Sequence, residues 1–347
     1  MKFENLNIKL DYINDKISKL DIIKLANKII IVAATYDQKI NKVLFYDATK
    51  SDDNDHSLNL ISKFDIAGDP TCIIRHLDSI FISTSKGNLY IFFINKFCEI
   101  SFSKYFDFGK NDSLINNGFH NDSCTALTVD TINDNLIISF IDGTLKILDL
   151  QTDKIIHTIS NFHNTYLSTL KFIPPNSLLC GDLCGTVKLV DLKTILTKLY
   201  HKSFYSQNID GGISALDVHP FNSNLVVCGD DQGLLTFWDL RKQAFPVQNS
   251  FNKHKSYVSG IKFHPNFPNK SLFSCSHDSK LLAWYNEQNT SDMFSSANDL
   301  DIQTIDLLED SNSCSINGMA LESDILVACT DNQGIFRIYL ENFISMT

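Results

Sequence analysis

Hydrophobic and polar residues alternate with a period of two in short segments along the chain, and the segments end at turn residues. Within residues 213–241, one alternating segment ends at His219-Pro220, and the last, 234–239, follows a turn at 230–233. Alternation over this length is typical of β-strands, and Gly, Asp and Asn favour the tight turns between them. The pattern predicts a unit of consecutive antiparallel strands.

This unit recurs along the whole chain. Residues 258–285 repeat it with His264-Pro265 at the same place, and weaker copies cover residues 29–47, 71–93, 126–150, 169–192 and 316–339. Copies spaced by about 40 to 60 residues fit the ~40–45-residue period of WD repeats with insertions. One small sheet cannot bury its faces alone, so the repeats must stack. We therefore expect an all-β fold, a seven-bladed WD-repeat β-propeller over residues 1–347, with eight blades as the main alternative.

The ends of the chain and two long connections complete this prediction. A terminal strand must complete the last blade, and residues 5–12 alternate suitably, with 341–347 as the rival segment. Insertions are expected at about 95–122 and 286–312, because these stretches break the rhythm of the repeats. Long loops without strands are uncommon and are often functional.

Each insertion carries apolar residues that admit two interpretations. In the first, alternating residues predict either the fourth strand of the second blade or an exposed aromatic patch; they are Ile100, Phe102, Phe106 and Phe108. The second insertion is rich in Asn, Ser and Asp and is either a simple surface loop or a partner-binding segment, with Phe294, Leu300 and Ile302 as the candidate contacts.

One repeat carries polar residues at the spacing of a WD-repeat hydrogen-bond network. His254 precedes the first strand, Ser276 ends the second, and the turn and third strand supply Asp278 and Trp284. Buried indole, imidazole and hydroxyl groups need partners, and these four side chains can satisfy one another. We predict a structural role for this network.

Residues with catalytic or metal-binding chemistry are better explained as parts of the repeat. Cys180 and Cys184 fall on a strand and a turn, without a second pair at zinc-site spacing. Asp230 and Asp231 lie in a repeat turn that is followed by a strand, unlike a phosphate-binding loop. We expect no metal, no cofactor and no enzymatic activity, although propellers can host enzymes.

Charge and composition narrow the class of partner. The formal net charge is −10, so direct nucleic-acid binding is not expected. No apolar run is long enough to span a bilayer, and the first residues lack the apolar core of a signal peptide. Nine scattered cysteines fit a reducing compartment such as the cytosol or nucleoplasm.

The late repeats resemble the forty-three-kilodalton WD-repeat nucleoporin family of the outer-ring, Y-shaped complex of the nuclear pore. The shared features lie within about residues 205–340: the two His-Pro pairs, Trp238-Asp239 followed by Leu240-Arg241, the run Leu272-Phe273-Ser274-Cys275-Ser276-His277-Asp278, and a long insertion after the sixth repeat. The third and fourth repeats lack Trp, unlike the fuller pattern of the late repeats.

The resemblance implies a scaffold that docks on a helical-solenoid nucleoporin, as one propeller within a hetero-complex. It implies a place in the nuclear envelope, a part in mRNA and protein transport, and an association with kinetochores in mitosis. The alternative function is a substrate receptor of a ubiquitin ligase or a histone-tail reader. That alternative rests on Asp239-Leu240-Arg241, because such propellers often carry Asp-x-Arg after a third strand, and it makes Arg241 a partner-binding candidate.

Overall fold

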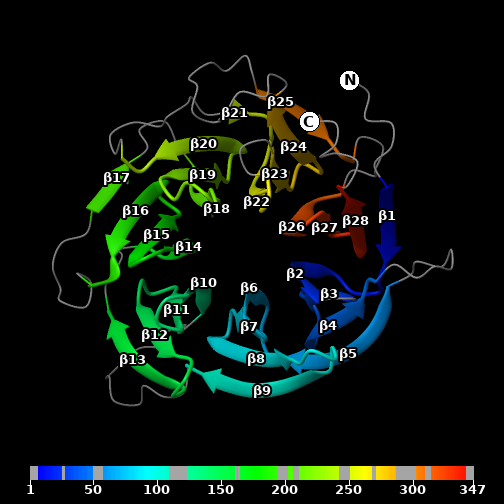
Figure 1. Cartoon of the computed structure of the whole chain (residues 1–347), viewed down its shortest axis with the longest axis horizontal. Helices are drawn as coiled ribbons and strands as arrows, with labels where there is room; N and C mark the ends of the chain where they lie inside the picture. Colours follow the sequence, from blue (N-terminus) through cyan, green and yellow to red (C-terminus); the bar gives the residue numbers. More distant parts are fainter. Residues whose placement is uncertain are drawn as a thin grey trace. The chain divides into compact units, whose positions relative to one another are not determined.

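The computed structural model describes residues 7–25, 28–49, 58–108, 123–160, 162, 165–193, 202–205, 211–241, 251–267, 271–286, 302–308 and 314–340. These residues form seven four-stranded antiparallel sheets (Figure 1). The predicted fold class is confirmed: the chain is nearly all β, and its seven sheets are the blades of a seven-bladed β-propeller. Each sheet keeps its strands in chain order, apart from the last, which takes a strand from the N-terminus.

The first four sheets follow one another along the chain. They contain β2 (Ile17–Leu25), β3 (Lys28–Thr35), β4 (Asn41–Asp47) and β5 (Asn59–Ile66); β6 (Pro70–His76), β7 (Ser79–Thr84), β8 (Asn88–Ile94) and β9 (Ile100–Asp107); β10 (Cys124–Asp130), β11 (Asn135–Phe140), β12 (Leu145–Asp149) and β13 (Lys154–Ile159); and β14 (Leu167–Ile173), β15 (Ser177–Asp182), β16 (Thr186–Asp191) and β17 (Lys202–Tyr205).

The other three sheets use the rest of the chain. They contain β18 (Ile213–Val218), β19 (Leu225–Asp230), β20 (Leu234–Asp239) and β21 (Phe251–Asn252); β22 (Val258–Phe263), β23 (Ser271–Ser276), β24 (Leu281–Asn286) and β25 (Ile302–Asp306); and β26 (Ile316–Glu322), β27 (Ile325–Thr330) and β28 (Gly334–Tyr339) with β1 (Asn7–Tyr12).

The chain divides into two compact units, whose boundaries cut through the sheets β2–β5 and β18–β21. The first unit comprises Met1–Ala34, Leu44–Ile61 and Ala215–Thr347, and the second comprises Thr35–Val43 and Ser62–Ser214. The second unit contains the sheets β6–β9, β10–β13 and β14–β17, whereas β22–β25 and the sheet of β26–β28 with β1 belong to the first.

The N-terminal strand completes the last sheet, as predicted. β1 pairs antiparallel with β28, from Asn7 opposite Tyr339 to Tyr12 opposite Gly334. The Arg337 guanidinium, which is 2% exposed, donates hydrogen bonds to both carboxylate oxygens of Asp11 at 2.7 and 3.0 Å. Such a bidentate pair adds an orienting, charge-assisted contact to the strand pairing. The rival segment, 341–347, lies outside the described residues.

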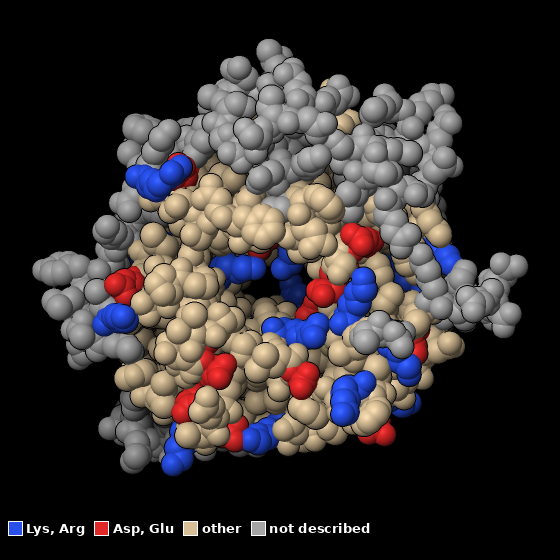
Figure 2. Space-filling model, in the orientation of Figure 1, with Lys and Arg blue, Asp and Glu red and all other residues tan. Residues whose placement is uncertain are grey.

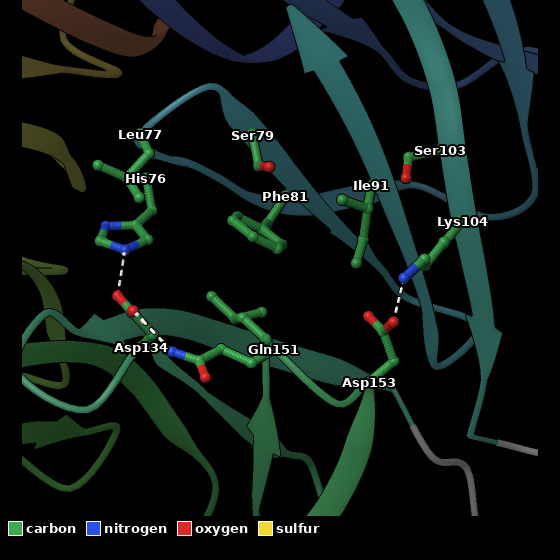
Figure 3. Close-up of a pocket in the computed structure, with 11 residues that line it drawn as sticks. His76, Leu77, Ser79, Phe81, Ile91, Ser103, Lys104, Asp134, Gln151 and Asp153 are labelled. Atoms are coloured by element: carbon green, nitrogen blue, oxygen red, sulfur yellow. Dashed lines mark hydrogen bonds and ion pairs between the residues drawn. The ribbon is translucent and has the colours of Figure 1, made fainter.

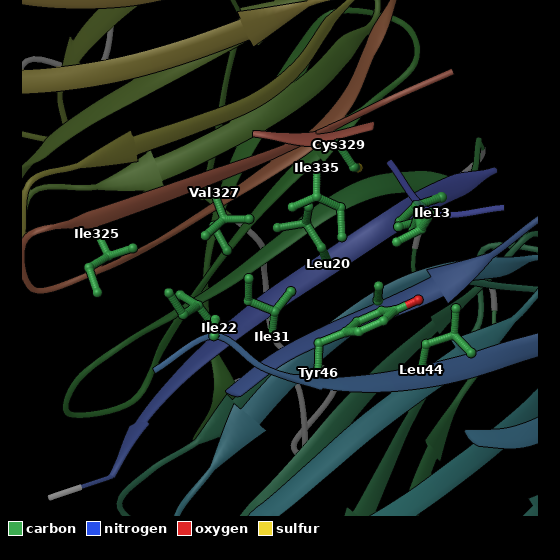
Figure 4. Packing of buried hydrophobic residues seen from close by; sticks show 14 of the residues in the cluster. Ile13, Leu20, Ile22, Ile31, Leu44, Tyr46, Ile325, Val327, Cys329 and Ile335 are labelled. Carbon is green, nitrogen blue, oxygen red and sulfur yellow. The ribbon is translucent and has the colours of Figure 1, made fainter. Parts of the chain in front are cut away.

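Apolar faces of neighbouring sheets form the core of each unit. In the first unit, residues of β2–β4 pack against β27 and β28 (Figure 4), including Leu20, Ile22, Ile31, Val327 and Ile335. In the second unit, one cluster joins residues of β7 and β8 to residues of β10 and β11. Alternation along each strand supplies these faces, and burying them supplies the main driving force for folding.

A polar residue near the start of a sheet's first strand repeatedly links that sheet to the next. Ser168, Ser259 and Asn317 are each the second residue of a first strand and lie at a register shift. Their side chains donate hydrogen bonds to the carbonyl groups that open the following first strands, those of Ile213, Ile316 and Ile17 respectively. The register shift leaves a residue outside the strand ladder, and its side chain is used between sheets.

Each of the two expected insertions contains a fourth strand of a sheet, so less of each segment is an insertion than the sequence suggested. Residues 100–107 form β9, the fourth strand of its sheet, so the strand interpretation of that segment is correct. Phe102 on this strand is nevertheless exposed. In the second insertion, β25 runs from Ile302 to Asp306 and pairs with β24. Both fourth strands were hidden because the connections before or after them are long.

Candidate protein-binding surface

The sheet β22–β25 contains a buried hydrogen-bond network close to the one predicted. The Trp284 indole N–H donates to Ser274 Oγ at 2.8 Å, and Ser274 Oγ lies 2.8 Å from His254 Nε2. His254 Nδ1 lies 3.2 Å from both carboxylate oxygens of Asp278. If His254 carries its proton on Nδ1, then Trp, Ser and His each donate to the next group in the chain. The network leaves none of these polar atoms without a partner.

The serine of this network is Ser274, so the prediction of Ser276 was wrong. Ser276 Oγ donates to the Ser256 carbonyl at 3.0 Å and accepts the Asp278 N–H at 3.1 Å. Residues two apart on a strand share a face, so both serines met the pattern. The pairing register distinguishes the two serines. Trp284 pairs with Leu272, which lies two residues from Ser274 and four residues from Ser276.

Asp278 stays ionised within this network. Burial opposes its charge, but hydrogen bonds from His254 and from the backbone N–H of Lys255 outweigh burial and lower the pKa of Asp278 to about 2. The carboxylate also accepts the Lys280 N–H at 3.1 Å. These contacts fix the turn between β23 and β24, which is a structural role.

The two His-Pro pairs close equivalent turns. His264 Nδ1 accepts the backbone N–H groups of Asn266 and Phe267, at 3.1 and 3.2 Å, and His219 Nδ1 accepts those of Phe221 and Asn222 in the same way. Burial lowers the pKa of His264. An imidazole that accepts through Nδ1 is neutral with its proton on Nε2. Both histidines therefore stabilise the turns that follow the first strands of their sheets.

The partner-binding candidates from the sequence are scattered. Ile302 is only 8% exposed on β25, so it belongs to the core and does not offer a contact. Phe294 and Leu300 lie outside the described residues. The exposed guanidinium of Arg241 is paired with Asp239, with Nη2 2.7 Å from a carboxylate oxygen. The structure brings none of these described candidates together.

A groove in the second unit was not found from sequence. It has a volume of about 250 Å³ and lies between the sheets β6–β9 and β10–β13. Phe81, Ile91 and Leu150 supply apolar walls. Figure 3 shows Phe81 and Ile91 with polar side chains around them. The groove's residues come from separate turns and strands, so no local motif marks it.

Two separate sets of paired polar side chains line this groove. His76 Nε2 lies 3.1 Å from Asp134 Oδ1, and the Gln151 amide donates to Asp134 Oδ2 at 3.3 Å. These hydrogen bonds, first that from His76, lower the pKa of Asp134. Across the groove, Lys104 forms an ion pair with Asp153 (Figure 3). The polar side chains therefore pair with one another around an apolar centre, and the carboxylates outnumber the lysine.

Two turns beside the groove expose large apolar side chains. Leu77, which lines the groove, is 71% exposed, and Ile132 is 60% exposed in the turn that also carries Asp134. The His76–Asp134 contact joins these two turns. Leu77 has a φ of 51°, in the left-handed region that Leu rarely adopts. Exposed apolar residues beside a groove are typical of a protein-binding site.

The described residues offer little reactive chemistry. Burial raises the pKa of the Cys180, Cys228 and Cys329 thiols, which keeps them protonated. Cys184 is exposed whereas Cys180 is buried. Within the described ranges, His, Cys, Asp and Glu side chains form no cluster of three that could hold a metal ion. Among the same residues, no helix has the length and hydropathy needed to cross a membrane.

Charge is mixed on the face of the molecule seen in Figure 2. Lys and Arg side chains are interspersed with Asp and Glu side chains among the described residues.

Known proteins match parts of the chain at low identity. The WD domain, G-beta repeat family matches residues 245–284. Nucleoporin Nup43 of Mus musculus is 24% identical over 162 residues, which cover 46% of this chain and 41% of the mouse protein. Nucleoporin Nup43 of Homo sapiens is 25% identical over 146 residues, 41% of this chain and 37% of the human protein. The match thus spans about two fifths of these relatives, and it confirms the resemblance to the WD-repeat nucleoporin family.

Two further matches concern the fold more than the family. A U3 small nucleolar RNA-associated protein 21 homolog of Schizosaccharomyces pombe is 24% identical over 165 residues, 47% of this chain and 17% of that protein. A chain in the crystal structure of the mitotic checkpoint complex superposes with a TM-score of 0.68, covering 95% of this chain and 90% of its own length, at 14% identity. At this identity the likeness shows the fold alone.

Proposed function

We propose that this chain is a structural scaffold nucleoporin that binds other proteins and does not catalyse a reaction. In this proposal it docks on a helical-solenoid subunit of the nuclear pore's Y complex. It thereby supports pore assembly and the transport of mRNA and protein between nucleus and cytoplasm. The similarity to nucleoporin Nup43 in two mammals carries the proposal.

The described side chains support a binding role. The best-connected polar groups, His254, Ser274, Asp278 and Trp284, satisfy one another inside a sheet and leave no group free for chemistry. The second unit instead offers exposed apolar side chains around a groove whose charges are paired. Apolar surface with a satisfied polar rim is the usual composition of a protein interface.

Localisation of the intact protein tests the proposal. A fluorescent tag at the native locus should give a continuous signal at the nuclear rim in interphase and, as the family resemblance implies, a signal at kinetochores in mitosis. A signal confined to nucleoplasm or cytoplasm would contradict a scaffold role at the pore.

The alternative function, a receptor of a ubiquitin ligase or a histone-tail reader, rests on Arg241. Its guanidinium is exposed yet paired with Asp239 within the same short segment. Arg241→Ala should leave the nuclear-rim signal unchanged if the chain is a nucleoporin. Loss of a ligase or chromatin complex from this variant, with the rim signal absent in wild type, would favour the alternative.

A further inference from the structure

We infer that the groove between the sheets β6–β9 and β10–β13 is where the helical partner docks. We name this surface the turn groove; it comprises the groove lining, which includes Leu77, and Ile132 in the turn that carries Asp134. Its occupant is an α-helical segment that inserts one apolar side chain and presents a Lys or Arg one turn away. This inference rests on the proposed function, because that function supplies the helical-solenoid partner.

The size of the turn groove fits one large side chain. Its volume of about 250 Å³ lies below the roughly 300–1,000 Å³ of pockets for small molecules. Phe81 and Ile91 are buried at its walls, so an inserted Leu, Ile or Phe would meet apolar surface. A helix laid in a groove uses such single anchors, spaced by three or four residues.

A partner can cover the polar rim of the turn groove without leaving a charged side chain unpaired. Asp134 keeps hydrogen bonds from His76 and Gln151, and Lys104 keeps Asp153. Burying a paired rim costs far less than burying an isolated ion. Two carboxylates, Asp134 and Asp153, face one lysine, Lys104, in this lining, so the carboxylates outnumber the lysine by one. That excess is the reason for assigning a basic residue to the helix.

The backbone conformation of Leu77 supports the turn groove as a binding site independently of the groove's lining. The turn from His76 to Ser79 has only two central residues, and Leu77 takes a φ of 51° there. Asn, Asp and Gly adopt this conformation readily, whereas in Leu the Cβ strains it. Leu77 is also 71% exposed, so packing within this chain does not offset that strain. A local rule broken in this way is expected where function requires the side chain.

Leu77 lines the groove, and Ile132 is exposed in the turn that carries Asp134, another residue of the lining. The His76–Asp134 bond of 3.1 Å ties together the turns that carry them. A helix crossing these two turns can place residues of one face on Leu77, in the groove and on Ile132. Hot spots of binding energy cluster in this way around a central anchor.

Quantitative binding tests the inference. The probe is the purified helical-solenoid nucleoporin that co-purifies with the tagged full chain, titrated by calorimetry against the full-length wild type and variants. Leu77→Asn should weaken binding about tenfold, and Ile132→Asn should do so less strongly. The thermal midpoint of Leu77→Asn should stay unchanged or rise, because Asn suits the turn, so a loss of binding would not reflect unfolding.

Phe221→Asn is the matched control. Phe221 is 72% exposed and also lies between the first and second strands of its sheet, β18–β21, away from the turn groove in sequence and sheet. It should bind like wild type. Wild-type affinity in Leu77→Asn, or equal weakening in Phe221→Asn, would overturn the turn groove as the site. If wild type itself binds no helical-solenoid nucleoporin, the proposed function fails, and this outcome is distinct from a failure among the variants alone.

A charge variant tests the basic residue on the helix. Asp134→Asn keeps an acceptor for His76 and a side chain that tolerates a positive φ, but it removes the excess charge. Its binding should be weaker by roughly threefold and less sensitive to salt. An unchanged affinity and salt dependence would overturn the assignment of a Lys or Arg opposite Asp134.

Discussion

The sheets β22–β25 and β6–β9 fill an equivalent core position with different kinds of side chain. Trp284 on β24 pairs with Leu272, and the equivalent residue on β8, Phe92, pairs with Ile80. Two residues further along the second strand, Ser274 in one sheet corresponds to Ile82 in the other. One sheet therefore places a polar network where its counterpart places apolar side chains.

The apolar version is stabilised by aromatic packing. Phe92 is buried, with its ring centroid 5.0 Å from that of Phe64 and 5.7 Å from that of Phe102. Ile66 lies four residues before the first strand, where the other sheet has His254. Tilted and edge-on aromatic contacts can supply stabilisation comparable to a few hydrogen bonds. A blade of this fold thus requires a filled position and does not require a particular chemistry.

The polar network and the apolar packing, the two solutions for this position, require different sequence patterns. The polar network needs four residue types at fixed spacing, and the family match at residues 245–284 falls on this sheet. The apolar solution accepts many residue combinations, so β6–β9 shows strand periodicity alone. The sheet without the signature is also the one that borders the turn groove.

Truncating the equivalent aromatic residue should have the largest effect in both sheets. Trp284→Ala and Phe92→Ala should each lower the free energy of unfolding by about 3–5 kcal/mol, because each leaves a cavity. Urea denaturation with far-UV circular dichroism measures this. An unchanged thermal midpoint for Trp284→Ala would refute its place in the core.

The choice of serine should separate the polar sheet further. Ser274→Ala should cost about 1–3 kcal/mol, because the Trp284 N–H and the His254 ring lose their shared partner. Ser276→Ala removes only turn contacts and should cost about 1 kcal/mol or less. The reverse order in denaturation experiments would restore Ser276 to the network.

Acid should loosen the polar sheet first. The pKa of Asp278 is lowered to about 2, so its stabilisation is complete above its ordinary pKa near 4 and is lost as the pH falls through about 2. The loss should reach about 2 kcal/mol. Exchange protection of β23 amides should fall over this window, whereas that of β7 amides should not. Asp278→Asn should abolish the difference.

His264 should add a milder change at higher pH. Burial lowers its pKa below the ordinary value of about 6.5, so its contribution is complete above that value and declines on acidification towards the lower folded pKa. Protonation would remove the acceptor of the Asn266 and Phe267 N–H groups. His264→Asn, which can still accept at this turn, should flatten the thermal midpoint between pH 7 and 5. An unaltered slope would contradict this role.

The smallest effect has the opposite sign. Leu77→Asn should stabilise the protein by up to about 1 kcal/mol by relieving the positive φ of Leu77. Differential scanning calorimetry can detect it. A clear destabilisation would mean that the Leu77 side chain packs within this chain and is not available to bind a partner.

Periodicity was sufficient to predict most of the fold. The spacing of strands and turns indicated seven repeats, and the alternation of residues 5–12 indicated the N-terminal strand that pairs with β28. These features are local or recur at a fixed period. The fourth strands β9 and β25 were obscured, because long connections beside them made their segments look like insertions.

The sites were harder, for two physical reasons. Ser274 and Ser276 share a strand face, so only the pairing register with β24 separates them. The turn groove joins His76 to Asp134, 58 residues away, through a contact that no local pattern encodes. One signal was available: a Leu in a two-residue turn between strands is unusual, and it marked Leu77.

Affinity purification of the tagged full chain, with mass spectrometry of the recovered proteins, tests the central claim most directly. The scaffold proposal predicts that outer-ring nucleoporins are recovered in stoichiometric amounts, a helical-solenoid subunit among them. Recovery of a cullin-type ligase or a chromatin complex without those nucleoporins would contradict it, and would leave the propeller fold in place with Arg241 as the first residue to mutate.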